Sequence, residues 1–258
     1  IIDGGSTDGS VEIIKKYEPW LTYWESMKDR GQPHAINKGF ARSTGEIMAW
    51  INSDDYYAPN AFSTIAKEIN KYTDIFWVVG NCDFIDKNGK KRRGWGRSFT
   101  EFEKWFVGTP FMQPGVFWKR KLWEKTNYID EGFNFSFDYE LWFQFAIIQS
   151  FPHWIDNQVA FFRKHDESKS VKNRTDFYPE NRIIQKRYSY LSPGVQKRLR
   201  IIQLKQERKS VKILNKYIHK IDLRSILGII SALFIAPWMI FKIGFYYQIK
   251  KNLLDRNS

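Results

Sequence analysis

The sequence predicts an α/β fold in which helices flank a mixed, mainly parallel β-sheet. Along residues 1–71, short apolar runs that suit buried strands alternate with amphipathic helical patterns, as in a parallel sheet with crossover helices. A longer apolar run at residues 75–85 is followed by an Asn-Gly hairpin turn. Beyond residue 178 the composition changes to a Lys/Arg-rich helical pattern, which we interpret as a helical C-terminal tail.

The opening of the chain alternates regularly between strands and helices. Bulky apolar runs bounded by Gly, Ser, Asp or Pro indicate the strands, and apolar positions on one face indicate the helices. We expect strands at residues 1–3, 22–26 and 45–51, and helices at residues 11–18, 33–42 and 59–71. Because Ile1 already has the pattern of a strand end, we also expect a missing strand and helix before it.

The elements that follow are more irregular in length. We expect strands at residues 75–85, 116–118 and 153–162, and helices at residues 99–107, 119–126, 138–148 and 181–190. Leu141, Phe145 and Ile148 share one face, and this spacing predicts the helix at residues 138–148. Residues 108–115 are too rich in Pro and Gly for regular structure.

The net charge of +13 is concentrated in the tail. Basic and acidic residues are equal in number up to His165, so essentially all of the excess lies beyond it. A domain that bound nucleic acid would itself carry the excess, so we expect no nucleic-acid partner. Residues 225–241 carry no charge, and an apolar run beside basic residues favours an anionic membrane surface.

We therefore predict three parts: a folded domain at residues 1–170, a basic helical tail at 171–221 and an apolar membrane-associating helix at 222–258. The expected location is the cytoplasmic face of the cell membrane, with residues 225–249 either lying on the bilayer or spanning it once. A buried core helix is the alternative for this segment. The single cysteine, Cys82, excludes an internal disulfide.

Two adjacent carboxylates, Asp54 and Asp55, follow the predicted strand at residues 45–51. In open α/β sheets, ligands bind in the crevice at the carboxyl ends of the strands. Two like charges side by side are costly unless a cation or hydrogen-bond donors compensate them. The pair therefore indicates a cation site, and the alternative is a polar turn in which one carboxylate caps the next helix.

Three further stretches carry polar groups at the ends of predicted elements. The loop from Gly4 to Ser10 is rich in Gly, Ser and Asp, which lets the backbone approach a ligand closely; an ordinary strand-to-helix turn has the same composition. Asp138 falls in the first turn of its helix, where an acid is either a cap or a pocket-facing base. His165 follows the last strand, a position more typical of the surface than of a ligand.

Taken together, the chain resembles the family 2 glycosyltransferases, an inverting group with the Rossmann-like GT-A fold. The resemblance covers residues 1–170, and its landmarks occur in the family's order and spacing. They are Ile2–Ser10, Asp29–Gln32, Ala35–Gly39, Thr44–Glu46, Asn52–Asp55, Gln113–Gly115, Asp138–Trp142, Arg163–His165 and Ser168–Ser170.

The resemblance implies that the adjacent carboxylates hold a metal ion and the diphosphate leaving group of the donor. A nucleotide sugar has a diphosphate leaving group, and a divalent cation neutralises the charge that develops as it departs. Asp55 would bind this metal, Asp54 would bind ribose or metal, and His165 would complete the metal or diphosphate site. Oxygen ligands suit Mn²⁺ or Mg²⁺, and an imidazole ligand favours Mn²⁺.

The resemblance also implies the donor and acceptor sites. Asp3, Gly4 and Ser6 would hold the nucleoside, and Asp29 and Arg30 would line the same pocket. The family more often has a second aspartate where this chain has Gly4, although a UDP-sugar remains the expected donor.

The implied general base is Asp138. It would deprotonate an acceptor hydroxyl on a cell-surface polysaccharide or lipid-linked glycan, and a single displacement would invert the anomeric configuration. Phe137 replaces the acid that often precedes this base, so we expect the pKa of Asp138 to be less perturbed by a like charge.

Two other functions compete with this prediction. A nucleotidyltransferase of the same fold class would activate a sugar phosphate and usually carries a Gly-rich phosphate loop near its N-terminus. The expected missing segment would hide that loop, but the later landmarks do not fit this class. A non-enzymatic adaptor would use only the basic tail to bind a membrane or nucleic acid. The order of the landmarks favours a metal-dependent hexosyl- or N-acetylhexosaminyl-transferase.

Overall fold

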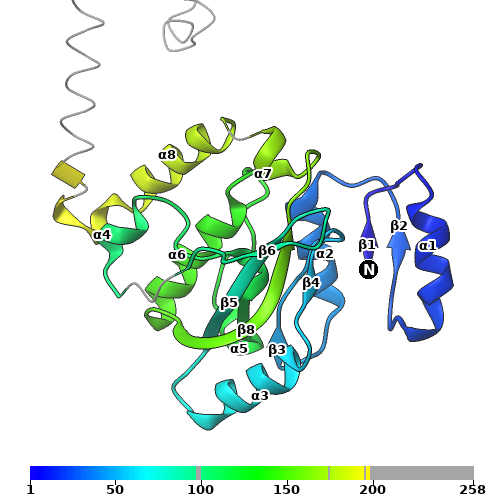
Figure 1. Cartoon of the computed structure of the whole chain (residues 1–258). Helices are drawn as coiled ribbons and strands as arrows, with labels where there is room; N and C mark the ends of the chain where they lie inside the picture. Colours follow the sequence, from blue (N-terminus) through cyan, green and yellow to red (C-terminus); the bar gives the residue numbers. More distant parts are fainter. Residues whose placement is uncertain (97–99, 174, 195, 198–258) are drawn as a thin grey trace, which may run out of the picture. The chain divides into compact units, whose positions relative to one another are not determined.

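The computed structural model describes residues 1–96, 100–173, 175–194 and 196–197 (Figure 1). These residues belong to one compact unit, Ile1–Leu199. The segment at 171–197, which the sequence analysis placed in a separate tail, is therefore part of the folded domain. The basic helix predicted from residue 195 onward and the apolar segment at 225–249 fall outside the described residues, apart from residues 196 and 197.

A mixed sheet of six strands forms the centre of the described part. Its strand order is β3-β7-β5-β8-β4, with β6 paired to β5. The strands are β3 (Ile47–Met48), β4 (Tyr56–Tyr57), β5 (Trp77–Ile85), β6 (Lys91–Arg92), β7 (Val116–Lys119) and β8 (His153–Arg163). The long strands β5 and β8 are parallel and lie at its centre.

The α/β fold class with a mixed sheet is confirmed, but the prediction of mainly parallel pairing is wrong for this sheet. Only β5 and β8 are parallel neighbours here, whereas β3, β4, β6 and β7 pair antiparallel with their partners. The alternation of strand and helix patterns along the sequence gives the order of the elements, but it does not show which strands are neighbours in the sheet. The short strands β3 and β4 pair with β7 and β8, which come much later in the sequence.

A second, two-stranded sheet holds the start of the chain. The strands β1 (Ile2–Asp3) and β2 (Glu25–Ser26) are parallel and are connected through α1 (Ser10–Tyr17), as a crossover unit requires. The register places Asp3 opposite Ser26. In Figure 1 this pair of strands lies apart from the larger sheet, on the far side of α2 (Gln32–Arg42).

The remaining helices cover the larger sheet and connect its strands. They are α3 (Ala61–Lys71), α4 (Phe102–Trp105), α5 (Arg120–Trp123), α6 (Phe137–Gln149), α7 (Lys169–Lys172) and α8 (Phe177–Arg187). Short 3₁₀ turns lie at η1 (Glu18–Trp20), η2 (Gln113–Gly115) and η3 (Ser189–Leu191). The helices predicted at 99–107 and 119–126 are thus single turns, and the irregular segment at 108–115 contains η2.

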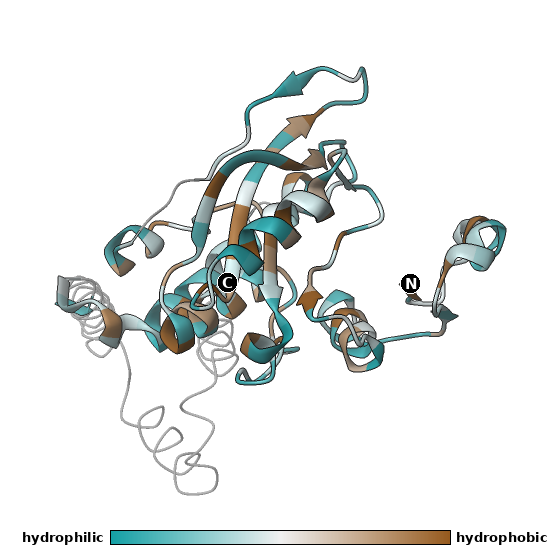
Figure 2. Cartoon of the chain, turned by 90° about the horizontal axis from the view of Figure 1, so that it is seen from below, coloured by the Kyte–Doolittle hydropathy of each residue, from teal (hydrophilic) through white to brown (hydrophobic). Residues whose placement is uncertain are grey.

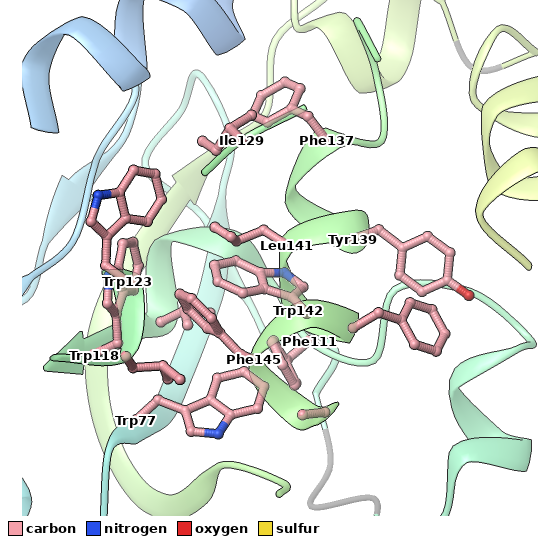
Figure 3. Packing of buried hydrophobic residues seen from close by; sticks show 14 of the residues in the cluster. Trp77, Phe111, Trp118, Trp123, Ile129, Phe137, Tyr139, Leu141, Trp142 and Phe145 are labelled. Atoms are coloured by element: carbon pink, nitrogen blue, oxygen red, sulfur yellow. The ribbon is translucent and has the colours of Figure 1, made fainter. Parts of the chain in front are cut away.

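The helix α6 runs through the main hydrophobic core. Its residues from Phe137 to Ala146 are buried except Asp138, which is half-buried, so this part of the helix is enclosed, whereas Ile147 in the last turn is exposed. Trp142 stacks between Trp50, at 5.6 Å between ring centroids, and Trp77, at 6.2 Å. Figure 3 shows Trp77 and Trp142 within this core. A fully buried Phe or Leu stabilises the fold by about 1.5–3 kcal/mol, so this packing fixes α6 firmly.

Hydropathy along the chain agrees with this arrangement. Hydrophobic stretches lie along the strands of the larger sheet, and hydrophilic residues dominate its hairpin end (Figure 2). Within the described ranges, none of the helices combines the length and the apolar character needed to cross a membrane.

Candidate active site

A cavity of about 650 Å³ opens beside the larger sheet and brings together three of the predicted site residues. Asp54, Asp138 and His165 all line it, and they come from three separate places in the chain. The wall is otherwise rich in aromatic side chains. These are Trp50, Trp95, Phe111, Phe135, Phe137, Phe162, Phe177 and Tyr178.

Asp54 and His165 form a contact at the edge of this cavity. Asp54 lies in the turn after β3, and His165 follows the end of β8. The Nε2 atom of His165 is 3.0 Å from Oδ2 of Asp54, and each side chain is about one-third exposed. A carboxylate oxygen and an imidazole nitrogen therefore face the same space, which the sequence could suggest only by resemblance.

Asp55 has a different position from its neighbour. It is buried and does not line the cavity, and its Oδ1 accepts a hydrogen bond of 2.9 Å from the backbone N–H of Arg163. Burial is the main reason that the pKa of Asp55 is raised to about 6; the hydrogen bond from Arg163 opposes this rise, and the charge of Asp54 adds to it. Asp55 thus attaches the turn after β3 to the end of β8, which brings His165 to Asp54.

The alternative in which Asp54 or Asp55 caps the next helix is wrong. The strand β4 intervenes, and α3 begins only after Asn60, whose own side chain makes no capping hydrogen bond. Residues 56 and 57 form β4, which pairs antiparallel with β8 and places Tyr56 opposite Phe161. The two carboxylates therefore lie in the turn between β3 and β4 and not at the start of a helix.

Asp138 lies in the first turn of α6 and faces the cavity. Burial raises its pKa to about 6, whereas a hydrogen bond of 2.7 Å from the backbone N–H of Tyr139 to Oδ1 lowers it. Lys169 lowers the pKa further and Glu180 raises it. The N-cap of α6 is Ser136, so Asp138 is not the cap that the alternative interpretation supposed. A carboxylate with a pKa near 6 is ionised at neutral pH and is still able to accept a proton.

Lys169 links the loop before α6 to the start of α2. Its Nζ donates hydrogen bonds to the backbone carbonyl of Asn134 and, at 3.4 Å, to Oε1 of Gln32. Gln32 in turn donates from Nε2 to Oδ1 of Asn52 at 2.7 Å. Burial lowers the pKa of the Lys169 ammonium, while the charges of Glu180 and Asp138 favour its protonated form.

The predicted nucleoside residues do not line this cavity. Asp3 instead organises its own loop: its carboxylate accepts hydrogen bonds from Ser26 Oγ at 2.7 Å and from Ser6 Oγ at 2.5 Å. It also accepts from the backbone N–H groups of Gly5 and Ser6, at 3.0 and 2.8 Å. These donors, the Ser26 hydroxyl foremost, lower the pKa of Asp3 to about 2.

Asp29 and Arg30 are held by protein contacts. Asp29 Oδ1 accepts from the N–H of Gly31 at 2.8 Å, and a Cβ added at Gly4 would lie 3.0 Å from its Oδ2. Glycine at position 4 therefore leaves room for this carboxylate. Arg30 donates from Nε and Nη2 to Oε2 of Glu131, at 3.0 and 2.6 Å, on the surface.

The sequence model of the family described as "Glycosyl transferase family 2" matches residues 1–126. The matched part of the chain, residues 1–126, belongs to that family. An uncharacterised glycosyltransferase of Nostoc sp. is 34% identical over 95 residues, which are 35% of this chain and 29% of that protein. The chondroitin synthase of Escherichia coli is 24% identical over 186 residues, 70% of this chain and 26% of that protein. The chain thus spans less than a third of the length of these two relatives.

A solved structure supports the fold of this glycosyltransferase. TarS residues 1–349 of Staphylococcus aureus, in complex with UDP-GlcNAc, aligns with a TM-score of 0.50 at 17% identity. The alignment covers 64% of this chain and 48% of that one. At this identity the likeness shows the fold alone, which is GT-A.

Three residues of this cavity received no role from the sequence. Lys169 and Gln32 occur in the landmark stretches, but only the structure shows that they meet each other beside Asn52. Gln113, in η2, is a third: its Nε2 donates to the carbonyl of Trp50 at 2.9 Å, and its Oε1 has no partner among the described residues. Its place in the landmark Gln113–Gly115 was the available signal.

Proposed function

We propose that this glycosyltransferase is an inverting, metal-assisted enzyme that transfers a sugar from a nucleotide diphosphate donor to an acceptor hydroxyl. The observation that supports the proposal is the shared cavity, which both the carboxylate of Asp138 and the Asp54–His165 contact line. The Asp138 carboxylate can accept a proton, and the side chains of Asp54 and His165 can hold a cation near a diphosphate. An inverting displacement needs both.

The side chains fit a divalent cation, with one change from the sequence-based assignment. Asp54 and His165 offer one oxygen and one nitrogen 3.0 Å apart at the cavity edge, whereas Asp55 is buried and bonded to Arg163. We therefore assign the metal to Asp54 and His165 and give Asp55 a supporting role. No group of three His, Cys, Asp or Glu side chains able to hold a metal occurs among the described residues. Two ligands leave the other coordination positions to donor oxygens and water, and the imidazole favours Mn²⁺ over Mg²⁺.

Asp138 performs the proton transfer in this proposal. Its ionised carboxylate accepts the proton of the acceptor hydroxyl, and the acceptor oxygen forms a bond to the anomeric carbon. The bond from that carbon to the diphosphate breaks on the opposite face, and the nucleoside diphosphate leaves with the electron pair. A bound cation would neutralise the charge on this leaving group. A single displacement inverts the anomeric configuration.

The donor in this proposal is a UDP-sugar. The chain is similar to TarS, whose structure is a complex with UDP-GlcNAc, and to a chondroitin synthase. The loop organised by Asp3, together with Ser6, Gly4, Asp29 and Arg30, would bind the nucleoside. Since Arg30 is paired with Glu131, it would have to leave that partner to reach a donor.

The acceptor and the location rest on the sequence. We propose a hydroxyl of a polysaccharide or lipid-linked glycan as the acceptor, and attachment to the cytoplasmic face of the membrane through residues 225–249. Sedimentation of the full chain with vesicles tests the attachment. Binding to phosphatidylglycerol vesicles that persists in high salt supports an apolar anchor, whereas no binding to any vesicle excludes it.

The experiment that tests the proposed reaction is a transfer assay with a panel of UDP- and GDP-sugars, with Mn²⁺ or with EDTA. We expect nucleoside diphosphate release from one donor, dependent on metal and on acceptor. The Asp138→Asn variant should retain donor binding and lose transfer. Full turnover by this variant, or full activity in EDTA, would contradict the roles assigned above.

A further inference from the structure

The helix α8 attaches to α6 at two separate places. Near its C-terminal end, Glu140 of α6 accepts hydrogen bonds from Arg187 at 3.0 Å and from the hydroxyl of Tyr188 at 2.5 Å. Near its N-terminal end, Glu180 reaches the loop that immediately precedes α6. Figure 1 shows α7 and α8 lying beside α6, and these contacts define how they meet.

Glu180 binds three consecutive backbone N–H groups. Its Oε1 accepts from Asn134, and its Oε2 accepts from Phe135 and Ser136, each at 2.8 Å. Hydrogen bonds from N–H groups to an ionised carboxylate are about twice as strong as those between neutral groups. An acid in the first turn of a helix favours that helix through its dipole, but this effect requires no contact with another segment. The three hydrogen bonds therefore indicate that Glu180, besides favouring its own helix, holds the loop before α6.

The loop that Glu180 binds is fixed from its other side as well. Lys169 of α7 donates to the carbonyl of Asn134 and lies 4.9 Å from the ring centroid of Phe135. Ser136 is the N-cap of α6 and is almost fully buried. Two residues later comes Asp138, so the orientation of this loop determines where that carboxylate points.

We propose that Glu180 is a positioning residue for the catalytic base: it holds residues 134–136, and with them the first turn of α6, so that Asp138 faces the cavity. This inference rests on the proposed function for the role of Asp138. It adds that α8, from a segment the sequence assigned to a tail, belongs to the catalytic machinery. Lys169 from α7 and Glu180 from α8 are the charged groups that act on the Asp138 carboxylate.

The test uses the full-length chain with Glu180→Gln and Glu180→Ala. Glutamine keeps the size of the side chain while removing its charge and one of its two acceptor oxygens, so it remains informative if alanine prevents folding. The matched control is Glu12→Gln, because Glu12 is also an acid in the first turn of a helix, α1, but is exposed. Circular dichroism and thermal unfolding confirm that each variant is folded.

Two measurements decide the proposal. Hydrogen–deuterium exchange by mass spectrometry should show faster exchange in peptides covering residues 134–140 for both Glu180 variants, and no change for Glu12→Gln. With the donor that the wild type uses, kcat should fall by about 10- to 100-fold while the donor KM stays within about two-fold. Unchanged exchange, unchanged kcat, or a rise in KM alone would overturn the proposal.

The two proposals fail in different ways. If the wild type turns over no nucleotide sugar, the proposed function fails, whereas the exchange measurement still decides whether Glu180 holds the loop. If the wild type is active and the Glu180 variants match it in both measurements, the positioning role fails and the proposed function stands.

Discussion

Replacing Asp138 by Asn should abolish transfer and, above pH 6, make the protein more stable. Burial is the main reason that the pKa of Asp138 rises from 3.8 to about 6. Each unit corresponds to about 1.4 kcal/mol, so holding the charged carboxylate in the folded state costs up to about 3 kcal/mol. Because water can enter the cavity that Asp138 lines, this is an upper bound. Asparagine removes the charge and can still accept the N–H of Tyr139.

The sign of the pH dependence follows from linkage. A pKa that is raised in the folded state means that this state binds the proton more tightly than the unfolded chain does. The protonated carboxyl of Asp138 makes its full contribution to the free energy of unfolding below about pH 4, and this contribution is lost as pH rises through about 6. The advantage of Asp138→Asn should therefore be absent near pH 4 and reach its maximum near pH 8.

Thermal unfolding of the wild type and of Asp138→Asn between pH 4 and pH 8 measures this difference. For a domain of this size, each kcal/mol shifts the melting temperature by about 2–4 °C. The control is Asp74→Asn, because Asp74 is an exposed aspartate before β5 that lies outside the cavity. If Asp138→Asn gives the same difference at pH 5 and pH 8, or is less stable at pH 8, the reasoning from burial is wrong. In the wild type, kcat should rise with pH through about 6.

Three further predictions follow from the site geometry. Asp54→Asn and His165→Ala should each raise the Mn²⁺ concentration for half-maximal activity by about 10- to 100-fold, measured by metal titration; an unchanged metal requirement would contradict the assignment. Asp55→Ala leaves the N–H of Arg163 without its partner and should cost about 1–3 kcal/mol in the free energy of unfolding, measured with urea. Arg30→Ala breaks an exposed pair with Glu131, so it should change stability by less than about 1 kcal/mol; a rise in donor KM would show that Arg30 also binds the donor.

Much of the site could be predicted because its residues follow strands or begin a helix. Asp54 and Asp55 stand after an apolar strand, Asp138 stands in a first turn, and His165 follows the last strand. Sequence could not show which of the adjacent carboxylates faces the cavity. That depends on the hydrogen bond from Arg163, a residue more than one hundred positions away, which leaves Asp54 at the cavity and Asp55 away from it.

The order of strands and helices could be predicted from the sequence, but the pairing of the strands could be predicted only in part. The Asn-Gly turn between β5 and β6 and the parallel pair β1 and β2 were both anticipated, since each depends on nearby residues. The antiparallel neighbours of β3 and β4 were missed. A strand of two residues carries too little pattern to specify a partner, so burial against distant strands selects it.

By itself the sequence determined the family, the order of strands and helices, and the residue types that carry the chemistry, because these are encoded in short local patterns. Only the tertiary structure decided what surrounds each of these residues. The absence of an acid before Asp138 suggested less perturbation of its pKa by a like charge, but nothing in the local sequence indicated the burial that raises this pKa to about 6. Likewise, Glu180 looked like part of a basic tail until its contacts with residues 134–136 joined it to α6. Burial and long-range hydrogen bonds depend on the whole fold, so local sequence does not encode them.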